Sequence, residues 1–151
     1  MTLAMDQMSI EHGGLFLSAF LAATILPFSS EAVLAGLYAA KGGIGAIALL
    51  TTASIGNTLG SFVNFLLGRL CLRWREARWF PVKAAELDRA TGWFRRFGTW
   101  SLLFAWVPVI GDPLTLAAGV LRVNVWLFLV LVGTGKVARY GVVLWAASVA
   151  A

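Results

Sequence analysis

The sequence predicts an all-α integral membrane protein with two inverted repeats, each a re-entrant helical hairpin followed by a transmembrane helix. The 151 residues are 60% hydrophobic and 13% charged, against roughly 45–50% and about 25% in soluble domains. The hydrophobic sequence is also interrupted twice by a proline with an acid four residues later, at Pro27 to Glu31 and at Pro108 to Asp112. The length leaves no room for a soluble domain of ordinary size, so a single membrane domain, residues 14–151, must carry the function.

The first interruption predicts a hairpin near the N-terminus. Residues 1–13 are mixed in polarity and are expected to form a short tail or an interfacial segment, and the apolar run 14–40 is then broken at Pro27 and Ser30. The arm before the break would rise about 20 Å, less than a hydrocarbon core of about 30 Å. One kinked spanning helix and a re-entrant hairpin both fit this pattern. We favour the hairpin, because irregular backbone at membrane depth must be shielded from lipid.

Residues 43–67 are long and apolar enough to form the first spanning helix. Spacings of three and four place small or polar residues on one face of this helix: Gly56, Asn57, Gly60, Ser61, Asn64 and Gly68. Close helix packing explains the two glycines four residues apart. Packing alone does not require Asn57 and Asn64, and we expect these asparagines to line a polar path.

The segment 68–98 is expected to be a cytoplasmic loop that contains an interfacial helix. It has eight basic and three acidic residues, and positive charge collects on the cytoplasmic side of membrane proteins. Tryptophan and phenylalanine alternate with the charges, as in helices that lie at the headgroup level. Nucleic-acid binding is a much weaker interpretation of the same pattern, because membrane flanks explain it. No nucleic-acid partner is expected.

The second half repeats the arrangement of the first. Residues 99–121 form a predicted hairpin with shorter arms around Pro108, Gly111 and Pro113, and residues 123–151 form the last predicted spanning helix. Aligning the two breaks pairs Pro27 with Pro108, Ser30 with Gly111, Glu31 with Asp112, and Asn57 with Lys136. If the first hairpin enters from one side, the second must enter from the other. Inverted repeats of broken segments are typical of secondary transporters.

Four charged residues lie inside the predicted hydrophobic segments: Glu31, Asp112, Lys136 and Arg139. Unpaired, each would cost at least about 2.5–3.5 kcal/mol at the bilayer centre. They could exist only to pair with one another, but a buried ion pair is often no more stable than an apolar replacement. We therefore expect a shared functional site in which the two acids exchange protons or balance charge. A single cysteine and a single histidine cannot form a metal site, and no metal or cofactor is expected.

Four motifs carry a resemblance to a known family. In chain order they are Leu26-Pro27-x-Ser29-Ser30-Glu31, Gly56-Asn57-x-x-Gly60, Trp106-x-Pro108-x-x-Gly111-Asp112-Pro113 and Gly135-Lys136-x-x-Arg139-Tyr140. On these motifs the chain resembles the DedA superfamily, and within it the small YqaA-type branch. The resemblance implies a multi-pass protein of the bacterial inner membrane with two re-entrant hairpins. It also implies movement of lipids, such as undecaprenyl phosphate or phospholipids, that depends on the proton-motive force.

The chain departs from the usual DedA pattern at two places. Asn57 stands where many members have an acid, and residues 105–111 lack the two arginines of the typical second hairpin. Those arginines would be natural phosphate ligands. Lys136 and Arg139 can supply the cations instead, from the next helix.

The leading hypothesis is a lipid flippase or scramblase that moves a phosphorylated lipid. Lys136 and Arg139 would hold the phosphate, while Glu31 and Asp112 would exchange protons or balance charge. The expected partners are membrane lipids and protons, and a second copy of the chain is left open. The alternatives are a proton-coupled transporter of a small solute and a non-transporting membrane component. An enzyme is least expected, because no nucleophile with a paired base, metal cluster or phosphate loop occurs.

Overall fold

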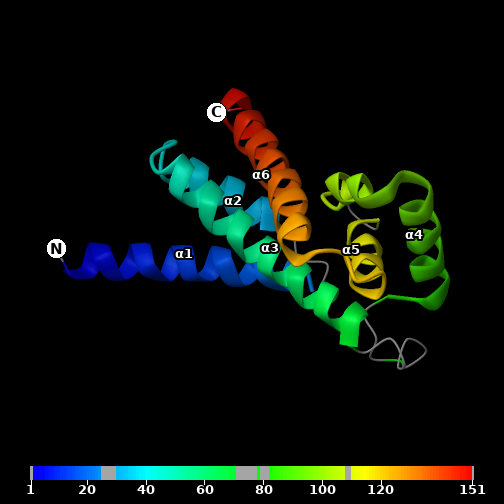
Figure 1. The fold of residues 1–151 in the computed structure, drawn as a ribbon. Coiled ribbons are helices and arrows are strands. Elements are labelled where there is room, and N and C mark those ends of the chain that lie inside the picture. Colours follow the sequence, from blue (N-terminus) through cyan, green and yellow to red (C-terminus); the bar gives the residue numbers. More distant parts are fainter. Residues whose placement is uncertain (1, 25–29, 71–77, 79–81, 108–109, 151) are drawn as a thin grey trace.

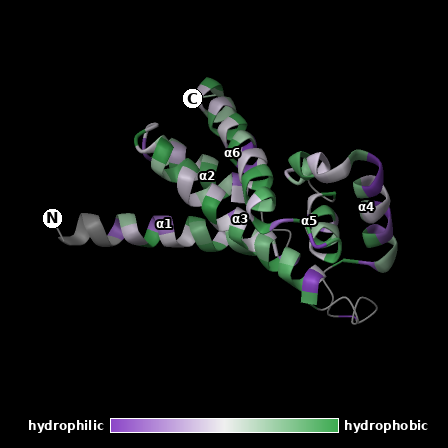
Figure 2. Cartoon of the chain, in the orientation of Figure 1, coloured by the Kyte–Doolittle hydropathy of each residue, from purple (hydrophilic) through white to green (hydrophobic). Residues whose placement is uncertain are grey.

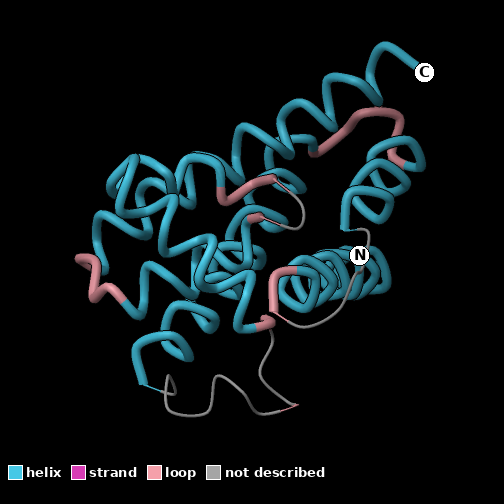
Figure 3. The backbone as a smooth tube through the Cα atoms, turned by 90° about the vertical axis from the view of Figure 1, so that its right-hand side faces the viewer, coloured by secondary structure: helices cyan, strands magenta, loops and turns pink. Residues whose placement is uncertain are grey.

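The computed structural model describes residues 2–24, 30–70, 78, 82–107 and 110–150. All regular elements in these ranges are helical, which confirms the predicted all-α class. In chain order they are α1 (Thr2–Ala22), α2 (Ser30–Ala40), α3 (Ala46–Leu70), α4 (Ala84–Phe97), the 3-10 helix η2 (Gly98–Phe104), α5 (Gly111–Val120) and α6 (Val125–Ala150). Most of the described loops between them are short (Figure 3).

Helices α3 and α6 are long and apolar enough to cross a membrane. They have 25 and 26 residues, so each rises about 38 Å, more than the hydrocarbon thickness of about 30 Å. The side chain of Asn124 caps the start of α6, where its Oδ1 accepts hydrogen bonds from the backbone N–H groups of Trp126 (2.9 Å) and Leu127 (3.3 Å). Figure 2 shows that α3 and α6 are mostly hydrophobic, whereas hydrophilic residues gather on α4 and at the end of α3.

Helix α3 lies at the centre of the fold and contacts α1, α5 and α6 (Figure 1). Its small glycines allow close approach on two sides. A Cβ atom at Gly56 would lie 2.6 Å from the carbonyl oxygen of Phe16 in α1, and one at Gly68 would overlap the carbonyl oxygen of Leu116 in α5. The Gly56 and Gly60 face therefore packs against α1 within the same chain.

We expect Gly60→Ala to weaken the packing of α1 on α3. The added methyl group would overlap the carbonyl oxygen of Phe20 and lie 2.8 Å from the Cβ of Ala23, and backbone cannot move aside easily. The free energy of unfolding should fall by roughly 1–3 kcal/mol, measured as a lower melting temperature of the purified protein. Gly36→Ala is the control, because no described atom lies within 4 Å of a Cβ placed there. Equal melting temperatures for the two variants would contradict this contact.

The elements that follow the two breaks correspond in the two halves. Ser30 and Glu31 are the first residues of α2, and Gly111 and Asp112 are the first residues of α5. Helices α2 and α5 have 11 and 10 residues, and the long helices that follow, α3 and α6, run in roughly opposite directions in Figure 1. This correspondence supports the inverted repeat, which, like the two re-entrant hairpins, stays a prediction. Three break residues, Pro27, Ser29 and Pro108, lie outside the described residues.

Two segments differ from the sequence expectation. Helix α1 begins at Thr2 and therefore joins residues 2–13, which were expected to form a separate short tail or interfacial segment, to the first apolar arm. Two contacts attach this part to the bundle: Glu11 pairs with Lys41 at 2.5 Å, and His12 Nδ1 lies 3.0 Å from Thr52 Oγ1. The first arm of the second predicted hairpin is the 3-10 helix η2. It begins at Gly98, whose φ of 66° ends α4.

Candidate functional site

The structure brings the four predicted charged residues together from three helices. Glu31 lies in the first turn of α2, Asp112 in the first turn of α5, and Lys136 and Arg139 in α6. Arg139 forms an ion pair with Glu31. Lys136 interacts electrostatically with both acids, and Asp112 with both bases. The cluster therefore combines one acid from each half of the chain with the two cations of α6.

Arg139 also connects the first half of the chain to the second hairpin. Its Nη1 donates a hydrogen bond of 2.9 Å to the carbonyl oxygen of Trp106, while its Nη2 faces Glu31. Trp106 follows the end of η2, where carbonyl groups have lost their partners within the helix. The guanidinium fork thus contacts an acid on α2 and the Trp106 carbonyl, which lies before α5. Arg139 is committed to these two contacts.

Lys136 differs from Arg139 in both its burial and its contacts. It is only 4% exposed, although a charged side chain is rarely buried without a partner. Among the described residues, no carboxylate lies within ion-pair distance of Lys136 Nζ and no acceptor is hydrogen-bonded to it. The two acids act on it from farther away. An ammonium group has three N–H donors, so Lys136 is the cation with capacity to bind an anion.

Tyr140 is a residue of the site to which the sequence analysis assigned no role. Its hydroxyl lies 2.8 Å from Ser30 Oγ, and both side chains are buried. The signal was present in the sequence, because Tyr140 follows Lys136 by four residues and so shares its helix face. The contact with the Trp106 carbonyl could not have been predicted in this way, because a backbone carbonyl is present in every residue and does not depend on the side chain.

Asn57 and Asn64 are buried and turn their amide groups toward α1. Asn57 Nδ2 donates to the carbonyl oxygen of Ala19 (3.0 Å), and Asn64 Nδ2 donates to that of Ala23 (2.8 Å). The Ala19 carbonyl is free because the last turn of α1 tightens, so that the Ala23 N–H bonds to Phe20 instead. The asparagines therefore hold the end of α1 on α3.

A line of unpaired oxygen atoms runs along the buried face of α3. It comprises the side-chain oxygens of Ser54, Asn57, Ser61 and Asn64, and none has a hydrogen-bond partner among the described residues. Buried polar groups are usually satisfied by protein or by ordered water. The polar path expected along this helix face stays a prediction.

The break residues that are described lie at the start of α2 and α5. Ser30, Gly111 and Pro113 are buried. A Cβ atom at Gly111 would overlap the carbonyl oxygen of Ala105, so the chain can turn closely only with glycine there. Pro113 lies in the first turn of α5, where a missing N–H costs no helical hydrogen bond. These residues position Asp112 at the start of α5.

Comparison with known proteins places the chain in a family. A model of the VTT domain matches residues 26–149. The chain is 39% identical over 126 residues to the inner membrane protein YqaA of Escherichia coli (strain K12), covering 83% of each chain. It is 35% identical over 141 residues to an uncharacterized protein of Haemophilus influenzae, covering 87% of this chain and 83% of the relative.

A more distant relative carries a functional name. The chain is 29% identical over 130 residues to undecaprenyl phosphate transporter A of Staphylococcus aureus, covering 80% of this chain and 64% of the relative. No solved structure matches the chain. The family match and the two apolar helices agree with the membrane protein that the composition predicts. The chain therefore belongs to the VTT domain family, the DedA superfamily, as a helical membrane protein of the YqaA-like type.

Proposed function

We propose that the protein is an inner-membrane flippase or scramblase that moves a phosphorylated lipid between the two leaflets. The observation that carries this proposal is Lys136, a buried ammonium group without a direct carboxylate partner. Family membership supports a membrane transporter. The name of the Staphylococcus aureus relative indicates a lipid with a phosphate headgroup. Lys136 has the charge and the free donors to bind such a group.

The two cations have different roles in this proposal. Lys136 binds the phosphate directly, because its N–H groups are uncommitted. Arg139 holds the site together, because it is bonded to Glu31 and to the Trp106 carbonyl. A phosphate near Lys136 adds negative charge to a cluster that contains two acids and two bases. A phosphate monoester carries about −1.5 to −2 at neutral pH.

Charge balance couples the binding of the lipid to the uptake of protons. With both acids ionised, the four side chains sum to zero, and a bound phosphate would leave the cluster strongly negative. Uptake of protons by Glu31 and Asp112 restores neutrality, and their release on the other side of the membrane restores the empty state. A proton gradient would then drive the lipid in one direction. Each acid interacts with both cations, so the protonation of either acid can respond to the phosphate.

Reconstituted vesicles distinguish a lipid transporter from a solute transporter. We expect the purified protein to accelerate the movement of a fluorescent phosphorylated lipid between leaflets, measured by the loss of protection from an impermeant quencher. Vesicles from the same preparation should retain trapped small anions as well as protein-free vesicles do. Flux of the trapped anions without lipid movement would contradict the proposal and favour a solute transporter.

A further inference from the structure

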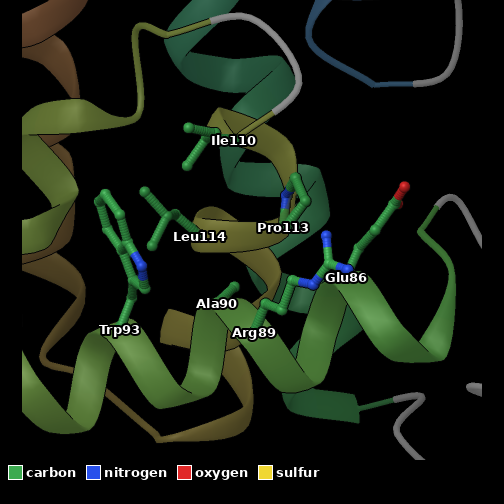
Figure 4. A pocket seen from close by; sticks show the side chains of 7 residues that line it. All are labelled: Glu86, Arg89, Ala90, Trp93, Ile110, Pro113 and Leu114. Atoms are coloured by element: carbon green, nitrogen blue, oxygen red, sulfur yellow. The ribbon is translucent and has the colours of Figure 1, made fainter.

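A cavity lies between α4 and the start of α5, away from the charged cluster (Figure 4). Its volume is about 250 Å³. Pockets that enclose a whole drug-sized ligand measure roughly 300–1,000 Å³, so this cavity suits a headgroup and the first part of a chain. Glu86, Arg89 and Trp93 line it from α4, and Ile110, Pro113 and Leu114 line it from the second predicted hairpin.

The cavity has one polar end and one apolar end. Figure 4 shows Glu86 and Arg89 beside Pro113 at one end, and the Trp93 ring facing Leu114 at the other. In the described part of the chain, no ion pair joins Glu86 to Arg89, and Glu86 accepts only a long hydrogen bond of 3.4 Å from the Lys83 N–H. Both charges are therefore available to a ligand.

The surroundings of the cavity indicate a lipid surface. Helix α4 buries Leu87, Ala90 and Phe94 against the fold and carries charged residues elsewhere. The aromatic side chains of Trp93, Phe97 and Trp100 are 44%, 52% and 68% exposed. Exposed tryptophan and phenylalanine among basic residues are typical of helices at the headgroup level of a membrane. The cavity thus opens where headgroups would lie.

We propose that this cavity binds the headgroup of a zwitterionic phospholipid, one with a phosphate and an ammonium group, as in phosphatidylethanolamine. The Arg89 guanidinium would hold the phosphate, because its planar fork matches two phosphate oxygens. Glu86 would accept hydrogen bonds from the ammonium group. The adjoining glycerol and chain would lie on Trp93, Ile110 and Leu114. One acid and one base leave the pair neutral, which matches a zwitterion better than an anionic lipid.

The site is separate from the cluster but adjoins the same helix. Pro113 and Leu114 line the cavity and directly follow Asp112 in α5. A bound lipid would therefore contact the helix that positions an acid of the cluster. Binding at this site does not require the lipid to cross the membrane, so the inference can fail while the proposed function stands.

Native mass spectrometry of the purified full-length protein tests the site. The protein is offered equal amounts of phosphatidylethanolamine and phosphatidylglycerol with the same chains, and the retained lipids are counted. Loss of one charged hydrogen-bond partner should lower retention roughly tenfold. We expect the wild type to prefer phosphatidylethanolamine, Arg89→Gln to retain about tenfold less of it, and Glu86→Gln to lose the preference. Arg95→Gln, on the same helix but outside the cavity, should behave like the wild type.

Two results would overturn the inference. One is equal retention of the two lipids by the wild type, which needs no variant and so does not depend on how a variant folds. The other is an unchanged preference in Glu86→Gln. Glutamine can replace glutamate in the capping box at the start of α4, so this variant should keep the helix, and its circular dichroism checks that it does.

Discussion

Lys136→Met should reduce lipid movement in vesicles to the rate of protein-free vesicles while leaving the protein folded. Methionine keeps the length and packing of a side chain that is only 4% exposed, but it removes the cation. A buried charged contact to a phosphate is worth roughly 2–5 kcal/mol, so the rate should fall at least about 30-fold. The fluorescent-lipid assay measures the rate, and the melting temperature reports the fold.

The matched control for this variant is Lys41→Met. Lys41 directly follows α2 and pairs with Glu11 rather than with the cluster. The same substitution there should leave lipid movement unchanged. If Lys136→Met moved lipid as fast as Lys41→Met, Lys136 would not be the phosphate ligand.

Glu31→Gln should abolish the dependence of lipid movement on a proton gradient and also weaken the fold. The substitution leaves Arg139 with the Trp106 carbonyl as its remaining bonded partner. Removing one member of a fully buried pair costs roughly 3–5 kcal/mol. The Glu31 and Arg139 side chains are 25% and 23% exposed, so the loss of stability should be smaller. The readouts are the melting temperature and the lipid rate with and without a pH gradient.

The double variant Glu31→Gln with Arg139→Gln separates pairing from proton exchange. Removing both charges should restore much of the stability, since no unpaired cation remains. If Glu31 only pairs with Arg139, proton-dependent transport should recover together with the stability. If Glu31 carries a proton, the stability should recover and the proton dependence should stay lost, which is the result that we predict.

The sequence was sufficient to predict the long helices and the central packing face. Residues 43–67 and 123–151 form apolar runs longer than about 18 residues, which is the length at which a spanning helix can be recognised. They correspond to α3 and α6. The glycine spacing in α3 indicated close packing, and the structure identifies α1 and α5 as the partners. The periodicity shows that one face of the helix carries small residues, but it does not identify the elements that pack against that face.

The local sequence was a weaker guide to structure in two segments where contacts between distant residues determine the conformation. The polar residues at positions 2–13 indicated a short tail or interfacial segment. They instead belong to α1, and Glu11 and His12 attach this part to Lys41 and Thr52. The segment before the second break is apolar enough for an α-helix, and Gly98 instead starts a 3-10 helix. Neither outcome follows from hydrophobicity alone.

The charged cluster was predictable because charge in an apolar segment is costly. Four such residues with balanced signs implied a common location, and the structure places them within electrostatic reach of one another. The sequence could not distinguish Lys136 from Arg139. Only the contacts show that Arg139 is occupied by Glu31 and Trp106, whereas Lys136 has uncommitted donors.

The central claim is that the cluster moves a lipid by binding its phosphate. The most direct test compares undecaprenyl phosphate with undecaprenol, the same lipid without phosphate, in vesicles that contain the wild-type protein. We predict that the protein accelerates the movement of the phosphate form between leaflets and leaves that of the alcohol at its protein-free rate. Equal acceleration of both lipids, or of neither, would contradict the claim.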